Sequence, residues 1–147
     1  MQKYGLIGYP LKHSFSIGYF NEKFKAENID AEYVNFEIPR IEDFMEVIEE
    51  NPNLCGLNVT IPYKKEVIPC LSELSPTAKK MGCVNTVLRR SDGTLYGHNT
   101  DYFGFTSLVR HAGLSVAGKK VLVLGSGGAS NTAVAALKEL GANPVVI

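Results

Sequence analysis

The chain has no tryptophan, and its 147 residues include only three cysteines, none of which forms a Cys-x-x-Cys pair. The odd number and wide spacing of Cys55, Cys70 and Cys83 argue against a metal site or a disulfide framework. We therefore expect free thiols in a reducing cytoplasm and no metal. Also missing are an apolar run of about 18 residues and, over residues 1–10, the layout of a signal peptide. We expect neither a membrane span nor a secretory leader.

The chain also has no excess of positive or negative charge, since 15 Lys and Arg balance 15 Asp and Glu. A nucleic-acid-binding protein needs a basic face, so this balance argues against a nucleic-acid partner. The hydrophobic content of 45% and the charged content of 20% are close to globular averages. The length suits one ordinary domain or parts of two.

Apolar residues recur with strand and helix spacings in alternation. Ile41, Phe44, Met45 and Ile48 follow the helical i, i+3, i+4, i+7 pattern, whereas Val34, Phe36 and Ile38 alternate as in a strand. We predict strands over 4–8, 34–38 and 54–60, helices after Ser16 and over 41–48, 62–71, 76–81 and 101–112, and a hairpin formed by 83–90 and 94–98. This order predicts an α/β fold with a mostly parallel sheet and a late antiparallel hairpin.

A glycine-rich stretch at 125–130 follows an apolar strand and precedes a helix. Gly125 allows a tight turn, Gly127 lets the backbone approach a pyrophosphate, and the small residue Ser130 permits close packing of helix on strand. Helix N–H groups would then bind the phosphates. This context favours dinucleotide binding over a purely structural turn. The candidate cofactor residues are Gly125, Ser126, Gly127, Gly128, Ala129 and Ser130.

A segment bracketed by Gly113 and Gly118, just before a new predicted strand, marks a boundary between a first unit, 1–112, and a second unit, 113–147. The second unit offers about 30 residues, the minimum for one βαβ piece. The residue that contacts the adenosine ribose would lie about 20 residues beyond the glycines, past Ile147. The sequence alone therefore does not distinguish NAD from NADP. We expect an incomplete Rossmann-like unit in a truncated chain. Its unpaired edge predicts a homodimer, a swapped assembly or disorder after about residue 117.

Lys64 is the most unusual polar residue. If Pro62 opens a helix, Lys64 lies in the first turn, where the helix dipole disfavours a cation by roughly 0.3–1 kcal/mol. Just upstream, Asn58 and Thr60 lie two positions apart and share one face of the predicted strand. Departures from a local rule tend to mark functional sites, so these three residues predict a polar site at the strand end. A solvated surface lysine is the alternative.

Four polar segments precede the glycine loop in a fixed order: His13-Ser14-Phe15-Ser16, the run 58–64, Gly82-Cys83-Val84-Asn85-Thr86 and Gly97-His98-Asn99-Thr100-Asp101. Together with that loop they resemble the shikimate dehydrogenase family over essentially the whole chain. The resemblance implies reversible reduction of 3-dehydroshikimate to shikimate in aromatic amino-acid biosynthesis, usually with NADPH. We expect no turnover by the chain as given, because hydride transfer needs the nicotinamide fixed near the substrate carbon.

The resemblance also implies residue roles. Ser14 and Ser16 would hold the substrate carboxylate, and Lys64 with Asp101 would form the catalytic pair. The groups that bind the ring hydroxyls would be Asn58, Thr60, Asn85 and Asp101, and 125–130 would be the cofactor phosphate loop. Asn99 and Thr100 suit turn and cap positions better than ligand positions.

Several of these residues also have plausible structural roles. Ser14 and Ser16 could cap the following helix. Asp101 could favour a helix start, Asn85 could satisfy backbone groups, and His13 suits a structural hydrogen bond better than a base. Two other functions stay open: a stand-alone module that binds a small hydroxy acid without catalysis, and a relative that prefers quinate.

Overall fold

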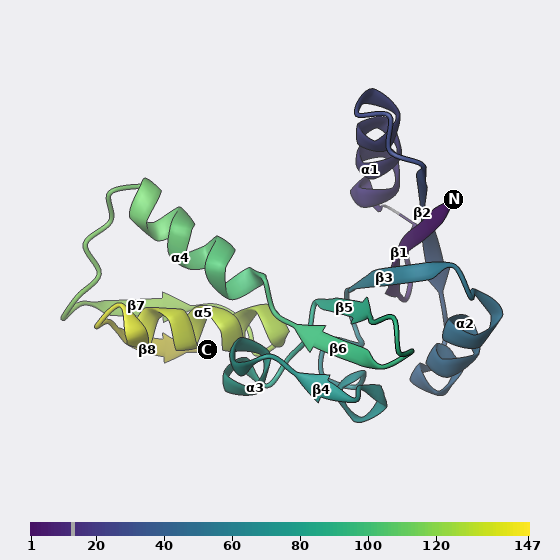
Figure 1. Cartoon of the computed structure of the whole chain (residues 1–147). Coiled ribbons are helices and arrows are strands. Elements are labelled where there is room, and N and C mark those ends of the chain that lie inside the picture. Colours follow the sequence, from purple (N-terminus) through teal and green to yellow (C-terminus); the bar gives the residue numbers. More distant parts are fainter. Residues whose placement is uncertain (13) are drawn as a thin grey trace.

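The structure, a computed structural model, describes residues 1–12 and 14–147; His13 lies outside the described residues. The chain is a mixed α/β protein with a six-stranded sheet of order β2-β1-β3-β5-β6-β4 and a separate two-stranded sheet, β7-β8 (Figure 1). The strands of the larger sheet are β1 (Gln2–Gly8), β2 (Ala31–Glu37), β3 (Leu54–Val59), β4 (Glu73–Leu74), β5 (Thr86–Arg89) and β6 (Leu95–His98). Those of the smaller sheet are β7 (Lys120–Val123) and β8 (Asn143–Val146).

The α-helices are α1 (Phe15–Ala26), α2 (Phe44–Glu50), α3 (Pro76–Met81), α4 (Asp101–His111) and α5 (Gly128–Glu139). Short 3-10 helices occupy Ile41–Asp43 and Ile68–Cys70. Helix α4 leads from β6 to the second sheet and lies beside α5 (Figure 1). Strand β7, helix α5 and strand β8 form a parallel βαβ unit.

Pairing in the larger sheet brings the ends of three strands to one edge. β1 pairs in parallel with both β2 and β3, so their carboxyl ends meet there. β5 pairs antiparallel with β3 and with β6, and the short β4 pairs in parallel with β6. The predicted α/β fold with a mostly parallel sheet and a late hairpin is confirmed, although β4 was not predicted.

The predicted helix over 62–71 is wrong. Residues 61–67 form successive turns, with the Tyr63 amide bonded to the Thr60 carbonyl and the Ile68 amide to the Lys65 carbonyl. Pro69 supplies the physical reason, because an internal proline lacks the N–H of the helical ladder and clashes with the carbonyl four residues back. Lys64 therefore lies in a turn, and the argument from the helix dipole does not apply to it.

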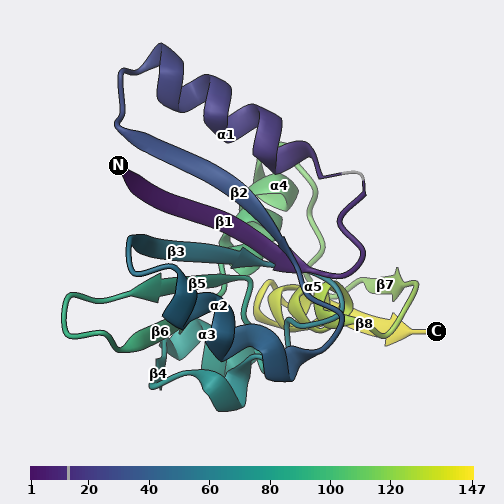
Figure 2. The same ribbon diagram turned by 90° about the vertical axis from the view of Figure 1, so that its right-hand side faces the viewer.

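The two faces of the sheet differ in chemistry. Alternation along β3 sends Leu57 and Val59 into the main core with Phe44 of α2. On the opposite face Leu6 and Tyr33 pack in a smaller cluster against Phe20 and Phe24 of α1. Figure 2 shows α1 lying beside β2, on the other side of the sheet from α2. Asn58 lies on this second face, so the α1 side is the one that carries polar groups at the strand ends.

Gly8 allows the segment after β3 to approach β1 closely. A Cβ atom at Gly8 would lie 2.5 Å from Cγ2 of Thr60 and 2.9 Å from the carbonyl oxygen of Ile61. We expect Gly8→Ala to lower the free energy of unfolding by about 1–3 kcal/mol, the usual cost of overpacking, as measured by urea unfolding. Gly104→Ala is the matched control, because nothing lies within 4 Å of that added Cβ and alanine favours a helix. Equal effects of the two changes would contradict this role for Gly8.

Candidate active site

Lys64 and Asp101 form an ion pair, with 2.6 Å between Lys64 Nζ and Asp101 Oδ2. Lys64 lies in the turn after β3, whereas Asp101 is the first residue of α4, after β6. Their side chains are 20% and 37% exposed, so both remain accessible to a ligand. The Lys64 carbonyl accepts a hydrogen bond from the Val84 amide, 2.7 Å, which ties the turn to the segment before β5.

Asn85 holds the second oxygen of Asp101. Its Nδ2 donates to Asp101 Oδ1 and to Thr100 Oγ1, each at 2.8 Å. Its Oδ1 accepts from the Thr100 amide at 2.9 Å and from the Thr86 hydroxyl at 3.0 Å. Two donors and two acceptor positions are all an amide side chain offers. With these four hydrogen bonds Asn85 orients Asp101. Its predicted contact with substrate stays a prediction.

Asn99 is a buried polar residue that fixes the start of α4. Its Oδ1 accepts from the Tyr102 amide at 3.1 Å, and its Nδ2 donates to the carbonyl oxygen and the sulfur of Cys83 at 3.2 and 3.1 Å. The predicted cap role is confirmed for Asn99. The Thr100 side chain makes no capping bond, and its oxygen accepts from Asn85.

The other predicted ligand residues lie near the amino end of α1 and the carboxyl end of β3. Ser14 precedes α1, and the described residues offer its buried Oγ neither a capping bond nor another hydrogen-bond partner. Asn58 Oδ1 accepts from the Tyr33 hydroxyl at 2.8 Å. A buried hydroxyl without a partner is costly, so Ser14 has a polar atom available for a ligand.

Sequence reasoning missed Tyr33, which is only 3% exposed. Its signal was weak, because a tyrosine in an alternating strand predicts burial without indicating what its hydroxyl contacts. A buried tyrosine usually finds such a partner. Here the partner is a predicted ligand residue, so Tyr33 belongs to the neighbourhood of the site.

Burial raises the pKa of Tyr33 to about 12, with a smaller opposing effect from the hydrogen bond of Ser16. Above about pH 10 an unfolded tyrosine loses its proton, whereas the folded chain keeps it, so the unfolded state binds fewer protons and stability falls as pH rises toward 12. We expect the free energy of unfolding of Tyr33→Phe to fall less between pH 9 and pH 11 than that of the wild type, as measured by urea unfolding. The same loss in both proteins would contradict the assignment.

The glycine loop faces Lys64 across a cavity of about 450 Å³. The cavity lining includes Thr60 and Lys64 on one side and Gly127, Gly128 and Ala129 on the other. A Cβ atom at Gly128 would lie 3.5 Å from the Lys64 side chain. Gly125 has φ of +110°, a left-handed conformation that favours glycine, as predicted for the tight turn. A smaller cavity, of about 320 Å³, places Asp101 opposite Ala129 and Thr132.

Direct contacts hold α5 near the ion pair of Lys64 and Asp101. The sulfur of Cys83 lies 3.7 Å from the carbonyl oxygen of Gly128 and 3.6 Å from Oγ1 of Thr132. An exposed ion pair joins Lys80 to Glu139. The predicted cofactor loop and the predicted catalytic residues are therefore brought together.

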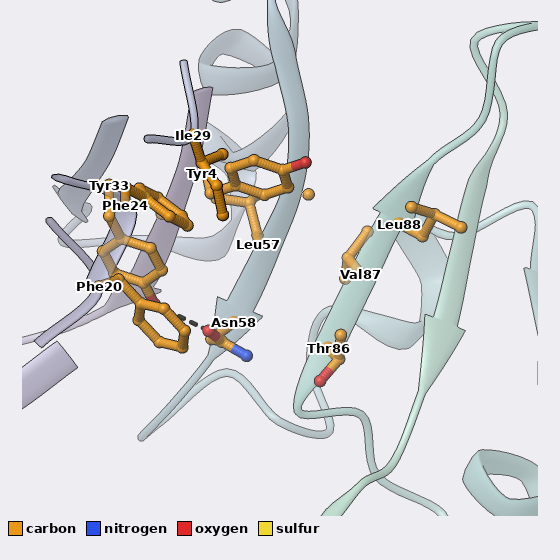
Figure 3. A pocket seen from close by; sticks show the side chains of 12 residues that line it. Tyr4, Phe20, Phe24, Ile29, Tyr33, Leu57, Asn58, Thr86, Val87 and Leu88 are labelled. Atoms are coloured by element: carbon orange, nitrogen blue, oxygen red, sulfur yellow. Dashed lines mark hydrogen bonds between the residues drawn. The ribbon is translucent and has the colours of Figure 1, made fainter. Parts of the chain in front are cut away.

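An apolar pocket of about 350 Å³ lies on the α1 side of the sheet (Figure 3). Aromatic residues of β1, α1 and β2 line one wall, and Val87 and Leu88 of β5 line another. Asn58 and Thr86 are its polar residues, beside Tyr33. This lining is mostly apolar and does not include Lys64 or Asp101, so the ion pair lies outside the pocket.

Among residues 1–12 and 14–147, no group of three or more His, Cys, Asp or Glu side chains is placed to hold a metal ion. No helix in that same part of the chain is long and apolar enough to cross a bilayer.

The sequence of this chain is similar to a known protein family and to several curated proteins. A family model described as the shikimate dehydrogenase substrate binding domain matches residues 6–87. A shikimate dehydrogenase (NADP(+)) of Carboxydothermus hydrogenoformans is 42% identical over 144 residues, which are 97% of this chain and 51% of the relative. The chain thus spans about half the length of such curated relatives.

Solved structures of shikimate dehydrogenases also resemble the fold of this chain. A shikimate dehydrogenase from Peptoclostridium difficile superposes with a TM-score of 0.90 at 40% identity, covering 99% of this chain and 56% of that one. A shikimate 5-dehydrogenase from Thermus thermophilus, solved in complex with NADP(H) and shikimate, gives 0.85 at 32% identity, with coverage of 99% and 55%.

Proposed function

The chain belongs to the shikimate dehydrogenase family, and we propose that it supplies the shikimate site and the catalytic pair of an NADP-dependent shikimate dehydrogenase. The observation that carries this proposal is the 2.6 Å ion pair of Lys64 and Asp101, with Lys64 lining a cavity shared with the glycine loop. In that arrangement a proton donor faces both a ring substrate and a dinucleotide.

Lys64 can act as the general acid in the reduction of a ketone. As an ammonium it polarises the carbonyl oxygen and donates a proton to it, and bound NADPH supplies the hydride. General acid catalysis of this kind contributes typically about 10²–10⁴-fold. Asp101, fixed by Asn85, directs the Lys64 ammonium and accepts a hydrogen bond from an adjacent ring hydroxyl.

We propose the predicted roles for the other residues that bind shikimate. Ser14 and Ser16 bind the carboxylate of shikimate, an assignment supported by the unpartnered Oγ of Ser14. Asn58 and Thr60 bind ring hydroxyls with Asp101. Asn85 joins them by exchanging one of its present hydrogen bonds, such as the one to Thr100 Oγ1, for a ring hydroxyl. Each lies at or beside the edge where β1 and β3 end.

The loop from Gly125 to Ser130 fits the pyrophosphate of NADP. Gly127 and Gly128 carry no Cβ, and the loop runs directly into the amino end of the 12-residue helix α5. The first N–H groups of a helix lack intrahelical partners and favour anions. We assign residues 1–112 to the substrate domain and 113–147 to the nucleotide-binding unit.

Location and assembly form a separate part of the proposal. We place the chain in the cytoplasm, where Cys55, Cys70 and Cys83 stay reduced. We also propose a homodimer or a swapped assembly through β7 and β8, whose exposed apolar residues include Leu122 and Val145. Light scattering that finds only a monomer would contradict this assembly.

Calorimetric titration of the chain with shikimate tests the binding proposal, and quinate is the matched comparison ligand. We expect saturable binding of shikimate that is tighter than binding of quinate, and no heat with shikimate at millimolar concentration would overturn it. Absorbance of the reduced cofactor, followed with shikimate and NADP present, should show no turnover by this chain, and turnover would contradict the expected truncation. The same assay on a protein that joins this chain to a complete nucleotide-binding domain separates the enzyme from a non-catalytic binding module.

A further inference from the structure

We propose that Tyr33 is a positioning residue: its hydroxyl sets the orientation of the Asn58 amide, so that Asn58 offers an N–H donor to the ligand. The oxygen of the ligand that faces Asn58 must then act as an acceptor. This inference rests on the proposed function, because shikimate is taken as the ligand.

The contact between the two side chains is direct. The Tyr33 hydroxyl donates to Asn58 Oδ1 at 2.8 Å, and Figure 3 shows the Asn58 nitrogen turned away from Tyr33. Across residues 1–12 and 14–147, no hydrogen bond engages that nitrogen. An amide in the opposite orientation would place its oxygen toward the ligand and its two N–H donors toward a hydroxyl.

The Tyr33 hydroxyl also keeps its proton. Burial raises the pKa of Tyr33 to about 12, so the hydroxyl stays protonated through neutral pH and can donate to Asn58.

Tyr33 is itself held firmly. Its backbone N–H donates to Asn21 Oδ1 and its carbonyl accepts from Asn21 Nδ2, each at 2.8 Å. Its ring stacks on Phe20 of α1 at 4.7 Å between centroids. Helix α1 and strand β2 therefore fix the Tyr33 hydroxyl against Asn58, a predicted ligand residue from a distant part of the chain.

A double-mutant cycle on the 147-residue chain tests the proposal, with shikimate affinity measured by calorimetry. Loss of one neutral hydrogen bond corresponds to about a three- to tenfold change, so Tyr33→Phe should weaken binding by about that factor. In an Asn58→Ala background the same change should have almost no effect, because the residue through which Tyr33 acts is gone. Tyr4→Phe is the matched control: Tyr4 lies beside Tyr33 in the sheet, but its hydroxyl contacts Gln2.

Unchanged affinity in Tyr33→Phe, or an equal loss with and without Asn58, would overturn the proposal. Asn58→Asp gives a second test that leaves Tyr33 intact, because it keeps an acceptor for Tyr33 and removes the donor. Its affinity should fall at least as far as that of Asn58→Ala, and wild-type affinity would overturn the donor assignment.

A wild-type chain without affinity for shikimate would overturn the proposed function instead. The NMR signals of the Asn58 side-chain amide, recorded without ligand, then decide the Tyr33 contact separately. They should shift in Tyr33→Phe and stay in place in Tyr4→Phe. Signals that do not move in Tyr33→Phe would overturn the orienting role of Tyr33.

Discussion

Lys64→Ala is expected to lower kcat for reduction of 3-dehydroshikimate by about 10²–10⁴-fold, the usual contribution of a general acid. KM should change far less, because the ammonium acts chiefly as the carbonyl oxygen gains charge in the transition state. The measurement needs a protein that joins this chain to a complete nucleotide-binding domain, assayed by absorbance of the reduced cofactor.

Lys65→Ala is the matched control for this change, since Lys65 is the exposed neighbour of Lys64 in the same turn. It should leave kcat near the wild-type value. Equal losses in the two alanine variants would contradict a proton-transfer role for Lys64.

Periodicity predicted the elements whose local pattern and tertiary environment agree. The helix over 76–81 and the hairpin strands appear where predicted, because Ser75 caps that helix through the Ala78 amide and Ser-Asp-Gly suits the hairpin turn. The helix over 62–71 failed because the prediction counted Pro62 as a helix start and overlooked Pro69 inside it. Lys64 was thus selected for a local reason that does not hold, yet it lies in the ion pair with Asp101.

Hydrogen-bond partners could not be predicted in the same way. Asn85 and Asp101 are 16 residues apart in sequence, and they meet only because the turn of the hairpin brings β5 beside β6. Tyr33 and Asn58 meet across β1, which separates their strands in the sheet. Alternation indicates which face a side chain occupies, whereas the partner depends on strand order, and this explains why Tyr33 was missed.

Asp101→Asn is expected to lower kcat/KM by about 10- to 150-fold, the range for losing a hydrogen bond to a charged group. The two oxygens of Asp101 accept from two donors, Lys64 Nζ at 2.6 Å and Asn85 Nδ2 at 2.8 Å. An asparagine offers only one oxygen, so its NH2 group must face one of these donors and displace it.

The assay is the one used for Lys64. Glu139→Gln is the control, because it also removes one carboxylate from an ion pair. That pair, with Lys80, is exposed. Exposed pairs contribute about 0–1 kcal/mol, so Glu139→Gln should leave kcat/KM within a few-fold of wild type. If Asp101→Asn were as mild as this control, the carboxylate would not be what directs the Lys64 ammonium, and the catalytic pair would reduce to a lysine alone.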